Sequence, residues 1–214
     1  MARRKPSRPR SSARSSTTPR GRSRMSEQAV TALAGAVFEG DVTVTEAGLQ
    51  GMVTLKADLG AVAVADAIAS VCGAGMPEAR RITTGKAMQV AWMAPDEVLI
   101  LCPHDRADSV VADLGKALEG VHNLAVNVSD ARAVFTVTGD AGVLKDTLSK
   151  LTPADMAALA PGEMRRTRLA QVAAAIWFED AGTARVICFR SVGRYVFDLL
   201  STAARPGGKV GYHR

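Results

Sequence analysis

The order of its predicted elements is the feature that most limits what this chain can fold into. Two successive stretches, residues 51–120 and 124–204, each begin with the alternating apolar residues of a strand, followed by a helical stripe, two strands and a second helical stripe. The order strand–helix–strand–strand–helix is typical of a ferredoxin-like, split βαβ unit. The sequence therefore predicts an α+β fold in which two βαββα halves share one mainly antiparallel sheet.

Turn residues and helix-stop residues set the element boundaries in the first half. Pro95 is the second residue of the turn 94–97 and favours a type I turn, so the strands on either side are predicted to form a hairpin. Gly73 and Gly120 each follow a helical stripe and end it. The predicted elements of this half are strands 51–57, 87–93 and 98–102 and helices 61–72 and 105–118.

Two polar residues mark helix starts in the second half. Asp140 and Ser191 each precede a helical stripe, and their side-chain oxygens can accept the free N–H groups of a first turn, so both are predicted N-caps. Leu148 lies on an apolar helix face, and we expect Leu148→Arg to unfold this half because it buries an unpaired charge. The predicted elements are strands 124–137, 166–178 and 184–190 and helices 140–151 and 191–204.

Positive charge is concentrated at the N-terminus. Residues 1–24 carry nine Lys or Arg and no acid, whereas residues 25–214 carry 18 basic and 21 acidic side chains. Residues 1–24 have too few apolar side chains for burial to offset the conformational entropy lost on ordering. We therefore predict that they form a disordered basic tail. Three interpretations of this tail stay open. It is an incidental extension that precedes a second start at Met25, a segment that weakly contacts a polyanion, or a targeting segment. The folded domain, 25–205, is predicted not to bind nucleic acid, and residues 206–214 to be a flexible end.

Several protein classes are excluded by what the sequence lacks. No stretch reaches the about 18 consecutive apolar residues of a membrane-spanning helix. Dinucleotide, phosphate-loop, zinc-protease and nucleophile-elbow motifs are missing. The cysteines, Cys72, Cys102 and Cys188, are odd in number and far apart, which fits neither a disulfide framework nor a zinc site. We therefore expect a cytoplasmic protein with no metal centre.

Four polar groups are candidates for chemistry, and each also has a structural explanation. They are Asn127–Asp130, Asp96–Glu97, Arg165–Arg168 and Arg190–Ser191. The arginine groups are able to hold an anion. Serine and aspartate near a strand start usually satisfy turn amides, however, and an arginine run protects a sheet edge. Cys72, Cys188, Trp92 and Trp177 lie in apolar patterns and are interpreted as core or interface residues. No catalytic, cofactor-binding or metal-binding residue is therefore predicted.

Four segments, taken together in their order and spacing, resemble the gamma subunit family of heterotetrameric sarcosine oxidase. The segments are Ala91–Ile100, Asn127–Ala133, Phe135–Gly139 with the helix 144–151, and Arg190-Ser191 with Tyr195. The resemblance covers roughly residues 40–204. The same arrangement is similar to the folate-binding domain of the wider aminomethyltransferase fold, so the resemblance implies that fold here.

The resemblance also implies membership of a complex with alpha, beta and delta subunits. Such a complex oxidatively demethylates sarcosine to glycine, forms hydrogen peroxide, and transfers the one-carbon unit to tetrahydrofolate as methylene-tetrahydrofolate. FAD, FMN, NAD and tetrahydrofolate are then expected in the partner subunits, none bound by this chain alone, and the gamma subunit is expected to be a non-catalytic structural partner. The alternative is a stand-alone folate-binding aminomethyltransferase-like protein, in which Arg168, Arg190 and Asp130 would line the pocket.

Overall fold

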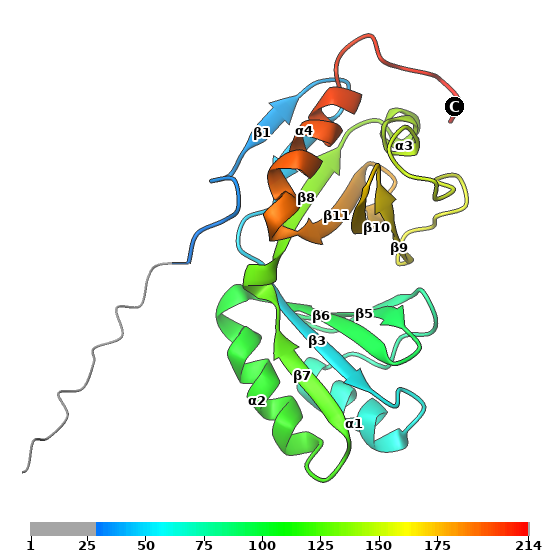
Figure 1. The fold of residues 1–214 in the computed structure, drawn as a ribbon. Helices are drawn as coiled ribbons and strands as arrows, with labels where there is room; N and C mark the ends of the chain where they lie inside the picture. The colour runs from blue at the N-terminus through cyan, green and yellow to red at the C-terminus, as the bar shows by residue number, and fades with distance from the viewer. Residues whose placement is uncertain (1–28, 214) are drawn as a thin grey trace, which may run out of the picture.

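The computed structural model describes residues 29–213, which form eleven strands and four α-helices (Figure 1). Residues 1–28 and 214, and with them the predicted basic tail, lie outside the described residues. The strands are β1 (Val37–Glu39), β2 (Thr43–Glu46), β3 (Gly51–Ala57), β4 (Ile82–Thr84), β5 (Gln89–Ala94), β6 (Glu97–Cys102), β7 (Asn123–Asn127), β8 (Arg132–Thr138), β9 (Met164–Leu169), β10 (Val172–Asp180) and β11 (Thr183–Phe189). The helices are α1 (Val62–Cys72), α2 (Ala107–Ala117), α3 (Ala141–Ser149) and α4 (Gly193–Ala203).

The strands form two sheets, where the sequence predicted one shared sheet. The five-stranded sheet has the order β4-β5-β6-β3-β7, and the six-stranded sheet has the order β1-β2-β8-β11-β10-β9. Every neighbouring pair is antiparallel, which confirms the predicted α+β class with mainly antiparallel strands. The chain crosses from one sheet to the other at residues 47–50 and returns at residues 128–131, so neither sheet is continuous with the other.

The two sheets face each other, and the helices cover their outer faces (Figure 1). Three apolar clusters correspond to these layers. One packs α1 and α2 on the five-stranded sheet around Val53, Ile68 and Leu114, and a second packs α3 and α4 on the six-stranded sheet around Phe135 and Leu148. The third lies between the sheets and consists of Met52, Ala91, Met93, Leu99, Leu101, Val134, Met164, Ala175, Trp177 and Ile187. Burial on both faces of each sheet explains the consecutive apolar residues of β6 (98–102) and β10 (172–178).

The two halves are topologically equivalent except at one edge. Strands β3, β4, β5, β6 and β7 occupy the same places in their sheet as β8, β9, β10, β11 and β2 in the other. Likewise, α1 follows β3 as α3 follows β8, and α2 follows β6 as α4 follows β11. Strand β1 has no counterpart, so the six-stranded sheet ends in β1 and the five-stranded sheet ends in β7.

Two predicted strands are each divided in the structure. The run 124–137 forms β7 and β8, which lie in different sheets and are separated by a 3₁₀ helix at Ser129–Ala131. The run 166–178 falls in β9 and β10, which pair as a hairpin. Its turn contains Ala170 with φ of 47°, a left-handed conformation that non-glycine residues rarely adopt.

The two predicted N-caps have different outcomes. The Asp140 carboxylate accepts hydrogen bonds from the backbone N–H groups of Gly142 (3.0 Å) and Val143 (3.1 Å), which confirms it as the cap of α3. The prediction for Ser191 is wrong. A 3₁₀ helix at Arg190–Val192 precedes α4 and already turns the chain, so α4 begins at Gly193 without a side-chain cap.

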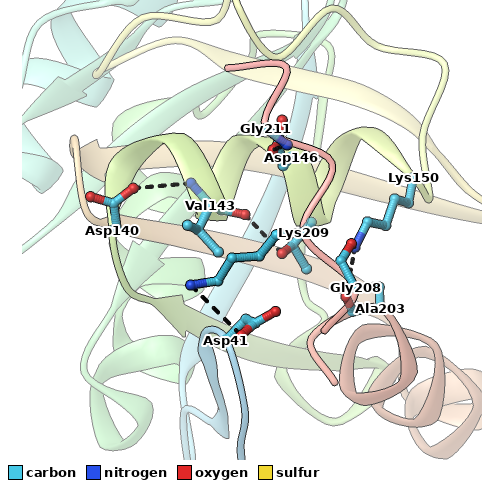
Figure 2. A network of polar contacts seen from close by, with 10 residues as sticks. Asp41, Asp140, Val143, Asp146, Lys150, Ala203, Gly208, Lys209 and Gly211 are labelled. Atoms are coloured by element: carbon cyan, nitrogen blue, oxygen red, sulfur yellow. Dashed lines mark hydrogen bonds and ion pairs between the residues drawn. The ribbon is translucent and has the colours of Figure 1, made fainter. Parts of the chain in front are cut away.

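The C-terminal residues run back across α3 (Figure 2). The buried Asp146 carboxylate accepts backbone hydrogen bonds from Gly211 (2.6 Å), Tyr212 (3.2 Å) and His213 (3.0 Å). A Cβ atom at Gly142 would overlap the carbonyl oxygen of His213, so glycine permits this close approach. None of the helices among residues 29–213 is long and apolar enough to span a membrane.

Candidate functional site

The serine of the Asn127–Asp130 segment has a structural role. Its buried hydroxyl accepts the backbone N–H of Met52 on β3 (2.9 Å) and donates to Oδ1 of Asn127 (2.6 Å). Asn127 Oδ1 also accepts the backbone N–H of Ser129 (3.0 Å). These bonds fix the segment where the chain leaves the five-stranded sheet, and they occupy the hydroxyl that a nucleophile would need.

The three residues considered for a folate pocket do not converge. Asp130 and Arg190 line the same open surface recess, whereas Arg168 lies on the edge strand β9, opposite Ala173. The Arg190 guanidinium is occupied, since its Nη2 donates to the backbone carbonyl oxygens of residues 30 (2.6 Å) and 31 (3.1 Å). The arginine therefore anchors the N-terminal segment.

Three of the remaining charged candidates, Asp96, Glu97 and Arg165, lie close to an opposite charge. Lys56 on β3 lies 3.9 Å from Asp96 and 3.8 Å from Glu97, at the β5–β6 hairpin. Arg165 on β9 forms an ion pair of 2.7 Å with Glu163, which directly precedes this strand. These contacts agree with a structural explanation of Asp96, Glu97 and Arg165, and the position of Arg166 and Arg168 on the edge strand β9 agrees with the protection of a sheet edge.

A narrow groove opens where the two sheets diverge. It encloses about 70 Å³ and is lined by Met93, Glu97, Leu99, Arg132, Arg166, Ala173, Ala174, Ala175, Ile187 and Phe189. Typical pockets for organic ligands are about 300–1,000 Å³, so a folate or a flavin does not fit. The volume suits a single side chain or one or two water molecules.

Neither arginine of this groove has an ionic partner among residues 29–213, and Arg132 also makes no hydrogen bond through its side chain there. Its guanidinium stacks on the Phe189 ring at 4.3 Å from the ring centroid. Burial lowers the pKa of Arg132, the nearby Glu97 opposes this shift, and Arg166 adds to it. Arg166 donates to the Met93 carbonyl (3.1 Å). Arg132 is thus available for a carboxylate that enters from outside.

Exposed apolar side chains occur on strands of both sheets. Leu124 and Val126 on β7 are 58% and 40% exposed, and Phe189 on β11 is 47% exposed. Val126 pairs with Thr54, which in turn pairs with the groove residue Leu99. We call Leu124, Val126, Phe189 and Arg132 the open face. The sequence did not predict these residues as a surface. Alternating apolar residues indicate that one face of a strand is buried, but they do not show whether this chain itself covers that face.

The cysteines and Trp177 behave as core residues, whereas Trp92 is only partly buried. Burial raises the pKa of the Cys72 and Cys188 thiols to about 11, and burial also raises the pKa of Cys102. Thiols with raised pKa values are poor nucleophiles at neutral pH. Trp177 lies in the cluster between the sheets. No group of three metal-ligating side chains occurs in the described part of the chain.

Comparisons with solved structures show the fold. The chain is similar to a chain of the heterotetrameric sarcosine oxidase from Corynebacterium sp. U-96 in complex with pyrrole 2-carboxylate, with a TM-score of 0.70 and 23% identity over 78% of this chain and 87% of that chain. It is also similar to the glycine cleavage system aminomethyltransferase T from Bartonella henselae, with a TM-score of 0.54 and 12% identity over 73% of this chain and 44% of that chain. These likenesses confirm the aminomethyltransferase-like fold.

Sequence comparisons show the family. No curated protein gives a significant match. The family model for the gamma subunit of sarcosine oxidase matches residues 56–205, a span that includes α1 to α4 and all strands from β4 to β11. Because this match covers more than half of the sequence, the chain belongs to the sarcosine oxidase gamma subunit family.

Proposed function

We propose that the chain is the non-catalytic structural gamma subunit of a heterotetrameric sarcosine oxidase. The observation that carries the proposal is the family match over residues 56–205. The assembled complex oxidatively demethylates sarcosine to glycine, reduces oxygen to hydrogen peroxide, and forms methylene-tetrahydrofolate. This chain takes part in sarcosine catabolism through its contacts with the alpha, beta and delta subunits.

The side chains of the chain support a structural role. Ser129 and Arg190 are occupied by backbone groups, and the groove between the sheets is too small for an organic cofactor. FAD, FMN, NAD and tetrahydrofolate accordingly belong to the partner subunits in this proposal. The open face supplies what a subunit contact needs, namely exposed apolar side chains and an arginine without an ionic partner.

Co-expression with the other three subunits tests the proposal. With an affinity tag on the alpha subunit, the chain is expected to co-purify at one copy per complex and to remain bound through size exclusion. The complex is expected to produce hydrogen peroxide from sarcosine. The chain purified alone is expected to show neither this activity nor flavin absorbance. A chain that stays monomeric when mixed with the alpha, beta and delta subunits contradicts the proposal.

Titration with tetrahydrofolate separates the structural role from a stand-alone folate protein. The isolated chain is expected to show no binding at micromolar concentrations, because Arg168 lies apart from the recess that holds Asp130 and Arg190. Micromolar binding that Arg190→Ala removes supports the stand-alone alternative and contradicts a purely structural role.

A further inference from the structure

A strand position is vacant at one edge of the five-stranded sheet. In the six-stranded sheet β1 pairs with β2, and β7 is the counterpart of β2 in the other sheet. Nothing among residues 29–213 occupies the place beside β7 that corresponds to β1. Helix α2 packs against β7 as α4 packs against β2, and in the six-stranded sheet β1 pairs with β2 in the presence of α4.

The backbone of β7 presents hydrogen-bonding groups to this vacant position. The N–H of Val128 donates to the carbonyl of Met52 (2.8 Å), and β7 pairs with β3 in the same antiparallel register. Alternate residues of an antiparallel strand bond to one neighbour, and the residues between them point to the other side. The N–H and C=O groups of Asn123, Ala125 and Asn127 therefore point away from β3.

The side chains of β7 lack the features that protect a sheet edge. Edge strands are commonly shielded by short length, by charged residues or by proline. Strands β1 and β4 have three residues each, and β9 carries Arg165, Arg166 and Arg168. Strand β7 has five residues, Asn-Leu-Ala-Val-Asn, none charged and none proline. Its Leu124 and Val126 are exposed on the face that looks toward the other sheet.

We propose that an extended segment of a partner subunit pairs antiparallel with β7 and becomes the sixth strand of this sheet. This inference rests on the proposed function. The partner segment has apolar residues at alternate positions, which cover Leu124 and Val126, while its backbone bonds to Ala125 and Asn127. Residues 1–24 of this chain are unsuited to the position, because they are rich in Arg, Ser and Pro and nearly lack apolar side chains.

Two substitutions in β7 test the strand pairing through different atoms. Ala125→Pro removes an outward N–H without removing a bond to β3, and Val126→Glu places a charge on the exposed apolar face. Each is expected to lower the amount of chain retained by tagged alpha subunit at least tenfold. Val62→Glu is the matched control, since Val62 on α1 is 75% exposed, and it is expected to be retained like wild type. Circular dichroism establishes that each variant is folded.

Hydrogen exchange distinguishes strand pairing from a contact of side chains alone. In the assembled complex the amides of Ala125 and Asn127 are expected to exchange at least tenfold more slowly than in the isolated chain. The amides of Leu124 and Val126, which already bond to β3, are expected to change little. Equal exchange of the Ala125 and Asn127 amides in both states overturns the inference.

The outcomes separate this inference from the proposed function. If wild type co-purifies and both β7 variants do so equally well, the inference fails and the proposed function stands. If wild type does not co-purify, both fail. If the isolated chain sediments as a dimer and Val126→Glu makes it a monomer, β7 pairs with a second copy, which overturns the assignment to a partner subunit.

Discussion

The two halves of the molecule share one topology but end their sheets differently. In the six-stranded sheet of the C-terminal half, β1 pairs with the outer edge of β2. The residues that precede β1 in the chain are held against this sheet. In the N-terminal half, β7 occupies the equivalent place and ends the sheet. The two halves therefore have the same arrangement of elements but different sheet edges. In one half β1 covers the edge of β2, and in the other half the edge of β7 is uncovered among residues 29–213. The partner strand that we propose would close this open edge.

Two sets of polar contacts hold the N-terminal segment against the six-stranded sheet. The Glu46 carboxylate on β2 accepts backbone hydrogen bonds from Leu33 (2.9 Å) and Gly35 (2.7 Å), and it is almost fully buried. Arg190, which precedes α4, binds the carbonyls of residues 30 and 31. Strand β7 has a side-chain contact with the helix that packs on it, from Asn127 to Asp108 on α2 (2.7 Å), and no added strand beside it among residues 29–213.

The largest effect is expected from a charge placed in the core of one half. Leu148 on α3 and Leu114 on α2 are both fully buried and lie in the two outer apolar clusters. Leu148→Arg is expected to cost more than about 4 kcal/mol and to unfold the C-terminal half, because the guanidinium has no buried partner. Urea unfolding followed by circular dichroism measures this loss, and Leu148→Met is the control of similar volume.

The same substitution in the other half sharpens the comparison. Leu114→Arg is expected to be equally damaging to the N-terminal half. A soluble and fully folded Leu148→Arg protein contradicts the assignment of this helix face to the core. If both variants lose all structure, the cluster between the sheets couples the halves into one cooperative unit.

A smaller effect is expected from Glu46→Gln, which tests the closure of the six-stranded sheet. The amide group cannot accept both backbone N–H groups, so one donor loses its partner, at a cost of about 2 kcal/mol. The free energy of unfolding from urea titration measures the loss. Glu39→Gln on β1 is the matched control, because Glu39 is exposed, and a change of less than about 0.5 kcal/mol is expected there. Equal effects of the two substitutions contradict a special role of Glu46.

The sequence allowed much of the local structure to be predicted, because local signals determine it. Apolar residues at helical spacing placed α1 within one residue of its bounds, and Asp140 caps α3 as its side chain predicts. Ser191 has the same chemistry but a different outcome, since the preceding residues form a 3₁₀ turn. A cap residue therefore indicates a helix start without locating it.

The division into two sheets was not predictable from such signals. Strands β7 and β8 form one alternating run in the sequence, and the strand that each one pairs with is distant along the chain. The turn at Ala170 carries no glycine to mark it. The open face was missed for the same reason, because the exposure of Leu124 and Val126 depends on which strand is absent beside them.

A still smaller effect is expected from Asp146, whose contacts strap the C-terminal residues to α3. Three backbone donors, the His213 N–H foremost, lower the pKa of Asp146. The pKa of an aspartate in the unfolded chain is about 4. Because the folded-state pKa of Asp146 is lower, its charge stabilises the fold fully at pH values above about 4. This stabilisation is lost as the pH falls through the folded-state pKa. Asp146→Asn is expected to cost about 1 kcal/mol at pH 7.

The pH dependence of stability checks the ionic origin of this effect. The difference in unfolding free energy between wild type and Asp146→Asn is expected to shrink as the pH falls below about 4. Asp198→Asn, which removes an exposed pair with Arg194, is the control and is expected to change stability by a few tenths of a kcal/mol. A difference that stays constant from pH 7 to pH 3 contradicts the role of the Asp146 charge.

The smallest expected effect is a change in the rate of thiol modification. The rates at Cys72 and Cys188 report how often each half opens locally. Cys72 lies in the outer core of the N-terminal half and Cys188 in that of the C-terminal half. Because burial raises both pKa values to about 11, about one thiol in 10³ is ionised at pH 8, and modification requires local opening. Mass spectrometry after timed alkylation gives a rate for each cysteine. Glu46→Gln is expected to accelerate modification of Cys188 several-fold more than that of Cys72, since it loosens one sheet. If Glu46→Gln accelerates the modification of Cys72 and Cys188 equally, the two halves open together. The pairing of β1 with β2 would then stabilise the five-stranded sheet as much as the six-stranded sheet.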